Sequence, residues 1–142
     1  MNRKRGILSL DSFEFEGGRQ RIQFGETVVV NEGVVCDTYS FPDDPTKDLG
    51  IIKIRPGHST PQQLVLQGDR TVEGYVSGIG QLSIDREDGA REIHPVNNGR
   101  SEKLQVDVNV GDKMQWQASL GSDLMAYEIC FPPYQDGRYE NL

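Results

Sequence analysis

The sequence is poor in the side chains that most often build metal and redox sites. Its 142 residues include two histidines, His58 and His94, and two cysteines, Cys36 and Cys130. The cysteines lie far apart along the chain and form no C-x-x-C pair, so neither a zinc site nor a redox motif is expected. Because disulfides are rare in cytosolic proteins, two buried thiols are the simplest interpretation.

Long apolar segments are missing as well. Hydrophobic residues make up 35% of the chain, and the mean hydropathy is −0.57. No run approaches the roughly 20 apolar residues of a transmembrane helix. The basic start, Arg3-Lys4-Arg5, is followed by a short segment, 7–10, before Asp11, which is too little apolar chain for a secretory signal. We therefore expect a cytoplasmic protein without membrane contact.

The charge balance disfavours nucleic acid as a partner. The chain carries 22 acidic and 15 basic residues, for a net charge of −7. A negative overall field repels phosphate backbones. The basic cluster Arg3-Lys4-Arg5, at a terminus that we expect to be frayed, is poor evidence for a local binding patch.

No helical period of convincing length is present. The chain instead holds short β-rich runs separated by turn signals such as Pro56-Gly57 and Asp88-Gly89. Apolar and polar residues alternate over 104–110, the period of a strand with one face in water. Roughly eight to eleven short strands predict an all-β, two-sheet sandwich or barrel in one domain.

Residues 51–85 resemble the first motif of the cupin family. The residues that carry the resemblance are Pro56-Gly57, Thr60-Pro61 and Glu73-x-Tyr75-Val76-Ser77-Gly78-x-Gly80. Gly111-Asp112 resembles the opening of the second cupin motif, and the resemblance extends over about 49–131. It implies a single cupin-type β-barrel, or jelly-roll sandwich, over 1–142, with its core at about 24–131 and an extension at each end. It also implies a homodimer formed through edge strands.

The metal-binding histidines of the family have no counterpart at the matching positions. In cupins, two histidines two residues apart follow the Thr-Pro, and with the motif's glutamate they hold a divalent metal. Counted from Pro56-Gly57 these positions are Gln63 and Val65, and counted back from Glu73 they fall within 66–69. A further histidine is expected near 117–122, and none occurs there. Only Glu73 is left as a plausible ligand, unless it is a surface carboxylate, so the expectation is no metal and no cofactor.

Candidate ligand-binding residues lie on the strands that resemble pocket-forming ones. Polar side chains inside a barrel need partners, and a bound ligand can supply them. The candidates are Gln63, Tyr75, Trp116 or Gln117, Tyr127 and Glu128. Trp116 and Tyr127 could equally be plain core. Lys53 and Arg55 share one strand face, which would form an anion clamp if it pointed inward and solvated charges if outward.

Three functions stay open at this point. The first is metal-independent binding of a small molecule, a sugar or an acidic metabolite. The second is a cupin-type sugar isomerase or epimerase, whose acid and base would come from His58, Glu73, Tyr75 and Tyr127. The third is a structural or dimer-forming barrel filled by its own side chains.

The C-terminal tail adds one more open question. Pro132-Pro133 ends the last long predicted strand, and Arg138, Tyr139 and Glu140 follow. These residues could fold back over the barrel as a structural lid, form a dimer contact or touch a ligand.

Overall fold

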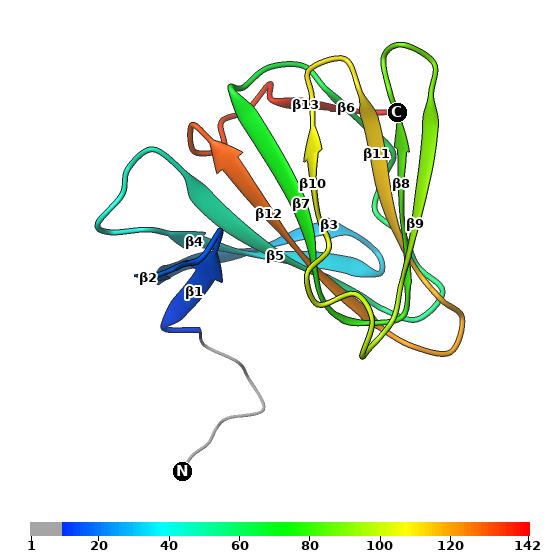
Figure 1. Cartoon of the computed structure of the whole chain (residues 1–142), viewed down its shortest axis with the longest axis horizontal. Coiled ribbons are helices and arrows are strands. Elements are labelled where there is room, and N and C mark those ends of the chain that lie inside the picture. The colour runs from blue at the N-terminus through cyan, green and yellow to red at the C-terminus, as the bar shows by residue number, and fades with distance from the viewer. Residues whose placement is uncertain (1–9) are drawn as a thin grey trace.

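Two antiparallel β-sheets face each other in a computed structural model that describes residues 10–142 (Figure 1). These residues form strands, turns and loops and include no helix. The strands are β1 (Ser12–Phe15), β2 (Gly18–Arg21), β3 (Gln23–Asn31), β4 (Val34–Ser40), β5 (Asp48–Ile54), β6 (Gln63–Val65), β7 (Arg70–Gly78), β8 (Gly80–Asp85), β9 (Arg91–Val96), β10 (Gln105–Val108), β11 (Lys113–Ala118), β12 (Leu124–Phe131) and β13 (Tyr139–Asn141). The all-β prediction is confirmed.

The strand order is that of a jelly-roll sandwich. One sheet has six strands in the order β10-β7-β12-β5-β4-β3, and the other has five in the order β13-β6-β11-β8-β9. Strands that are neighbours in the sequence, such as β6 and β7, pass from one sheet to the other. The hairpin β1–β2 is a separate two-stranded sheet beside the larger one (Figure 1). Among residues 10–142, no helix is long and apolar enough to cross a membrane.

The alternation along the central strands produces two separate apolar clusters. On β12, Leu124 and Ala126 face the opposite sheet and pack in the main core, together with Trp116. Tyr127 and Ile129 face away from that sheet and pack beneath the hairpin β1–β2. Because a strand alternates its side chains, the larger sheet is apolar on both faces.

The hairpin β1–β2 differs from the sequence-based expectation, which gave only an extension before a core that begins at about residue 24. Phe13 packs edge-to-face on Tyr127 with ring centroids 5.0 Å apart, and Phe15 lies near Phe131. These aromatic contacts order a segment that shows no convincing period of its own. The cluster Arg3-Lys4-Arg5 lies outside the described residues.

Two further segments lie in strands. The strand after Asp88-Gly89 is β9, which runs to Val96 and includes His94. The C-terminal tail folds back and pairs as β13 with β6. The hairpin turn itself is confirmed, since Gly89 has φ of +96°, a conformation that glycine reaches at low cost.

Candidate functional site

A cavity of about 520 Å³ opens between the two sheets at the end where β13 pairs with β6. The larger sheet supplies one wall from β3, β4, β5 and β12, and the C-terminal tail supplies another. The polar side chains in its lining are Glu26, Thr38, Asp48, Thr60, Gln63, Glu128, Tyr134, Asp136 and Tyr139. The thiols of Cys36 and Cys130 also line the cavity.

Two glutamates meet at the inner end of this cavity. Glu73 on β7 lies directly opposite Glu128 on β12 in the antiparallel ladder, so their side chains emerge on the same face. Glu73 is 1% exposed, whereas Glu128 is half-buried and lines the cavity. The indole N–H of Trp116, from the facing sheet, donates to Glu73 Oε1 at 2.7 Å.

The Glu73 carboxyl is held in its protonated form. Burial, followed by the negative charge of Glu128 and a hydrogen bond to it, raises the pKa of Glu73 well above 4.5. Glu73 Oε2 has no protein donor to accept from. The neighbour of Glu73 across the ladder is the carboxyl group of Glu128, so two carboxyl groups meet here and one of them is shifted toward its neutral form. Such a pair can offer an acid and a base side by side.

Four further groups of the wall are also shifted toward their neutral forms, namely Asp48, Cys36, Cys130 and Tyr139. Burial raises the pKa of the Asp48 carboxyl, while a hydrogen bond from the Tyr134 backbone N–H opposes that shift. Burial also raises the pKa of Cys36 to about 12 and the pKa of Cys130 still further. Tyr139, whose hydroxyl lies 3.4 Å from the Cys130 sulfur, has its pKa raised by burial and by Glu128.

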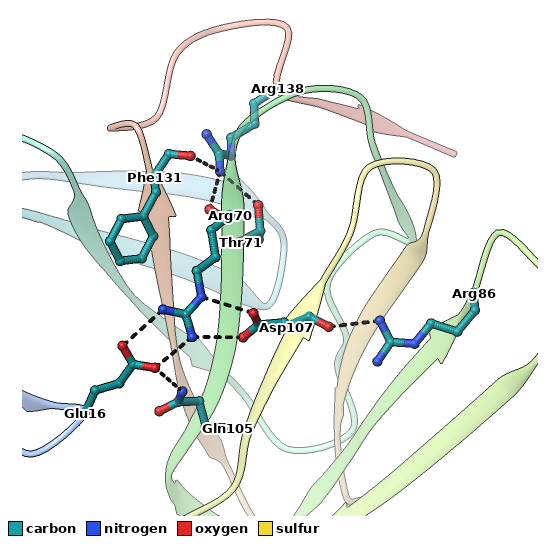
Figure 2. A network of polar contacts seen from close by, with 8 residues as sticks. All are labelled: Glu16, Arg70, Thr71, Arg86, Gln105, Asp107, Phe131 and Arg138. Atoms are coloured by element: carbon teal, nitrogen blue, oxygen red, sulfur yellow. Dashed lines mark hydrogen bonds and ion pairs between the residues drawn. The ribbon is translucent and has the colours of Figure 1, made fainter.

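Arg138 fastens the tail that forms the outer wall (Figure 2). Its buried guanidinium donates to the Arg70 backbone oxygen at 2.8 Å, to Thr71 Oγ1 at 2.9 Å and to the Pro132 backbone oxygen at 3.1 Å. Gly68 leaves room for it, because a Cβ there would lie 2.5 Å from the guanidinium carbon. The residue that follows, Tyr139, is thereby set over the cavity.

The predicted ligand-binding residues fall in several places. Gln63 and Glu128 line the cavity, and Trp116 lies behind it against Glu73. Tyr75 also faces the core, but its hydroxyl donates to the Gly78 oxygen away from the cavity.

Other candidates lie on outer faces. Tyr127 packs under the hairpin β1–β2, and Gln117 accepts a hydrogen bond from Gln81 on the outside of the smaller sheet. Lys53 pairs with Asp37 at 2.8 Å, and together with Arg55 it borders a different cavity on the outer face of the larger sheet. The outward alternative for these two basic residues is the one observed.

Both histidines lie away from the carboxyl pair. His58 Nδ1 contacts the Pro56 oxygen at 3.0 Å in the turn, and His94 Nε2 contacts Glu92 at 3.1 Å on β9. Of the four candidates for acid–base chemistry, only Glu73 reaches the cavity region. The sequence reasoning missed Asp48 and Cys130 as site residues, although the period of two on β12 already places Cys130 on the same face as Glu128. Tyr139 had been named as a tail residue that could touch a ligand.

Comparisons with known proteins give matches in structure alone. No family model and no curated protein sequence matches the chain. Oxalate decarboxylase from Bacillus subtilis superposes with a TM-score of 0.68 at 13% identity, over 97% of this chain and 33% of that one. Streptomyces PAC13, solved with uridine, gives a TM-score of 0.59 at 14% identity, over 82% of this chain and 83% of that one. The capsular polysaccharide assembling protein CapF from Staphylococcus aureus gives 0.63 at 14% identity, over 85% and 31%.

This chain has the cupin fold. It spans about a third of the length of the oxalate decarboxylase and of CapF. At 13–14% identity these likenesses describe the backbone, so the chemistry has to be argued from the side chains present in this chain.

The side chains of this cupin fold do not suit the divalent metal that the family implies. Such a site needs imidazole or carboxylate groups converging on one point. At the positions in question β6 presents Gln63 and Val65, which leaves Glu73 alone of the expected metal ligands. Across residues 10–142, no three His, Cys, Asp or Glu side chains come together in a way that could hold a metal ion.

Proposed function

We propose that the cavity between the sheets binds one small polyhydroxylated molecule, such as a sugar, without a metal ion. The observation that carries this proposal is a cavity of about 520 Å³ whose wall includes Glu128, which lies directly opposite the buried Glu73 in the ladder. Small-molecule sites commonly measure about 300–1,000 Å³ and place a few polar groups in an otherwise apolar wall. A structural barrel filled by its own side chains would not need this space.

The lining favours a sugar over an acidic metabolite. It contains four carboxylate residues and no lysine, arginine or histidine. An anionic ligand would therefore meet like charges in a partly buried site, where repulsion is weakly screened. The basic pair Lys53 and Arg55, which would have suited an acid, borders the other cavity.

A matched pair of variants tests the binding site. Gln63→Trp places an indole in the cavity mouth, whereas Gln117→Trp adds the same bulk on the outer face of β11. We expect a neutral monosaccharide panel, followed by calorimetry, to show saturable binding that Gln63→Trp abolishes and Gln117→Trp preserves. Equal binding by both variants, or no binding by the unaltered protein, would reject the proposal.

The raised pKa of Glu73, which lies opposite Glu128, favours a second candidate function, a sugar isomerase or epimerase. In this alternative the Glu128 carboxylate accepts a proton from a substrate carbon next to a carbonyl group, and Glu73 supplies a proton through the pair. Proton NMR of ketose and aldose substrates in heavy water would detect it as loss of a carbon-bound proton signal. Exchange that Glu128→Gln removes would establish turnover, and binding without exchange would leave only the first function.

Two expectations about the whole protein also stay predictions. An edge-to-edge homodimer would use β3, the nine-residue strand at the free edge of the larger sheet. Sedimentation velocity would detect it, and fractionation of cells would test the expected cytoplasmic location.

A further inference from the structure

We propose that the molecule bound in this cavity carries a protonated amine, which the carboxylates of Glu128 and Asp48 bind. The inference rests on the proposed function, since it names the chemical class of the ligand for the same site. It is argued from the charges of the wall, from the hydrogen bonds already used there and from the buried acid behind it.

The wall has a strong excess of negative charge. Glu128 and Asp48 are both partly buried and repel each other, while Glu26 and Asp136 lie nearer the surface. The charge of Arg138 partly opposes the raised pKa of both Glu73 and Asp48, but its guanidinium bonds backbone oxygens and Thr71 and lies outside the lining. An ammonium group placed between Glu128 and Asp48 would relieve their repulsion.

The hydrogen-bond donors of the wall are largely in use. Thr38 Oγ1 donates to the Glu26 backbone oxygen at 3.0 Å, and Gln63 Nε2 donates to Asn141 at 3.1 Å. Thr60 Oγ1 lies 3.5 Å from the Trp116 oxygen. The carboxyl groups of Glu128 and Asp48 each accept one such bond, from the Cys130 thiol at 3.5 Å and from the Tyr134 backbone N–H at 2.8 Å, and their other oxygens are further acceptors. A ligand rich in N–H and O–H donors therefore matches this wall, and an ammonium group supplies three donors.

The buried acid is an independent observation pointing the same way. Glu73 is 1% exposed, and its Oε2 has no protein donor. Glu73 lies opposite Glu128 in the ladder, and no lysine, arginine or histidine lines the cavity to pair with the Glu128 carboxyl group. A buried carboxylate is normally paired, so the missing partner is one that the ligand brings.

Titration calorimetry with matched probes tests the inference. The probes are glucosamine and glucose, which differ by an ammonium group in place of a hydroxyl, together with putrescine as an amine without a sugar ring and calcium chloride as an inorganic cation. At pH 7 and low salt we expect glucosamine to bind at least about tenfold more tightly than glucose, since a charge-assisted hydrogen bond replaces a neutral one. Glu128→Gln keeps the side-chain shape and removes the charge, so it should reduce that preference to near unity.

Two further variants guard against failure of one protein to fold. Asp48→Asn removes the second carboxylate and should also weaken the preference for the amine. Glu32→Gln, at the exposed turn between β3 and β4, removes one negative charge at a distance and should leave the preference unchanged. Thermal melting of each variant confirms that the fold is intact before titration.

The outcomes separate this inference from the proposed function. If glucose binds as tightly as glucosamine, the inference of an amine is overturned, while the cavity keeps its role as a sugar site. Calcium binding with no binding of either amine would also overturn it. No binding of any probe at millimolar concentration would overturn both, and an amine preference that survives Glu128→Gln and Asp48→Asn together would place the amine elsewhere.

Discussion

Among residues 10–142, Glu73 is the acidic residue with the lowest solvent exposure, 1%. An acid with a raised pKa in the folded state binds a proton that the unfolded chain releases above its ordinary pKa of 4.5. Folding therefore becomes less favourable as pH rises above that value, by about 1.4 kcal/mol per pH unit until the folded-state pKa is passed. The raised pKa of Glu73 is therefore a cost to stability near neutral pH.

Glu73→Gln tests this directly. The amide can still accept the Trp116 N–H through its oxygen and donate to Glu128 through its nitrogen, and it does not titrate. We expect the variant to unfold at a urea concentration close to that of the unaltered protein at pH 4.5 and at a clearly higher one at pH 8. If the urea concentration of unfolding changed with pH in the same way for both proteins, a raised pKa at Glu73 would be contradicted.

At the scale of elements, two additions hold the sandwich together: the hairpin β1–β2 and the tail ending in β13. Arg70 lies between them (Figure 2). Its side chain bonds Glu16 of the hairpin at 2.7 and 3.0 Å and Asp107 of β10 at 3.0 and 3.2 Å, while its backbone oxygen accepts from Arg138. Arg70 in β7 thus fixes the hairpin β1–β2 on the outer face of the sheet through its side chain. Through its backbone oxygen it also fixes the tail over the cavity.

The hairpin is held by aromatic packing more than by these exposed ion pairs, which contribute up to about 1 kcal/mol each. We expect Phe13→Ala to lower the free energy of unfolding by about 1–3 kcal/mol, since it removes a half-buried ring from Tyr127. Phe24→Ala is the control, because Phe24 is 48% exposed where it meets Tyr39. Urea unfolding should show the larger loss for Phe13, and equal losses would argue against a structural hairpin.

The tail depends on Arg138. The variant Arg138→Met keeps much of the apolar volume of the side chain and removes every donor. We expect it to lower the free energy of unfolding by roughly 1–3 kcal/mol. Hydrogen exchange should then speed up at Leu66, whose N–H donates to the Arg138 oxygen, while β7 and β12 stay protected. Arg91→Met, which breaks an exposed pair with Asp85, should leave Leu66 protected.

These elements also show what the sequence could and could not predict. The period of two over 104–110 and the Asp88-Gly89 turn are local signals, and both led to the correct fold class. Glu73 and Glu128 were each recognised as candidates, but their meeting depends on the register between β7 and β12, which includes a shift at Met125/Ala126. A single sequence contains no local signal for a register between strands 55 positions apart, or for a hairpin ordered by distant aromatic rings.

At the scale of the whole molecule, the sandwich keeps its two thiols from solvent in different ways. Cys36 is half-buried in the cavity wall, whereas Cys130 is 2% exposed beneath Tyr139. The variants Cys36→Ser and Cys130→Ser each leave one thiol. Because the pKa of Cys36 is raised to about 12, only a small fraction of this thiol is ionised at pH 8. We expect its alkylation to be about a thousandfold slower than that of free cysteine.

Cys130 should react only when the two sheets separate. Its alkylation by iodoacetamide should therefore follow global unfolding and accelerate with urea in proportion to the equilibrium population of the unfolded state, whereas Cys36 should show a weaker urea dependence. Mass spectrometry of the two single-thiol variants over a urea series measures both rates. Fast labelling of Cys130 in the absence of urea would mean that the tail lifts locally from the cavity, because only that motion exposes this thiol while the sheets stay packed.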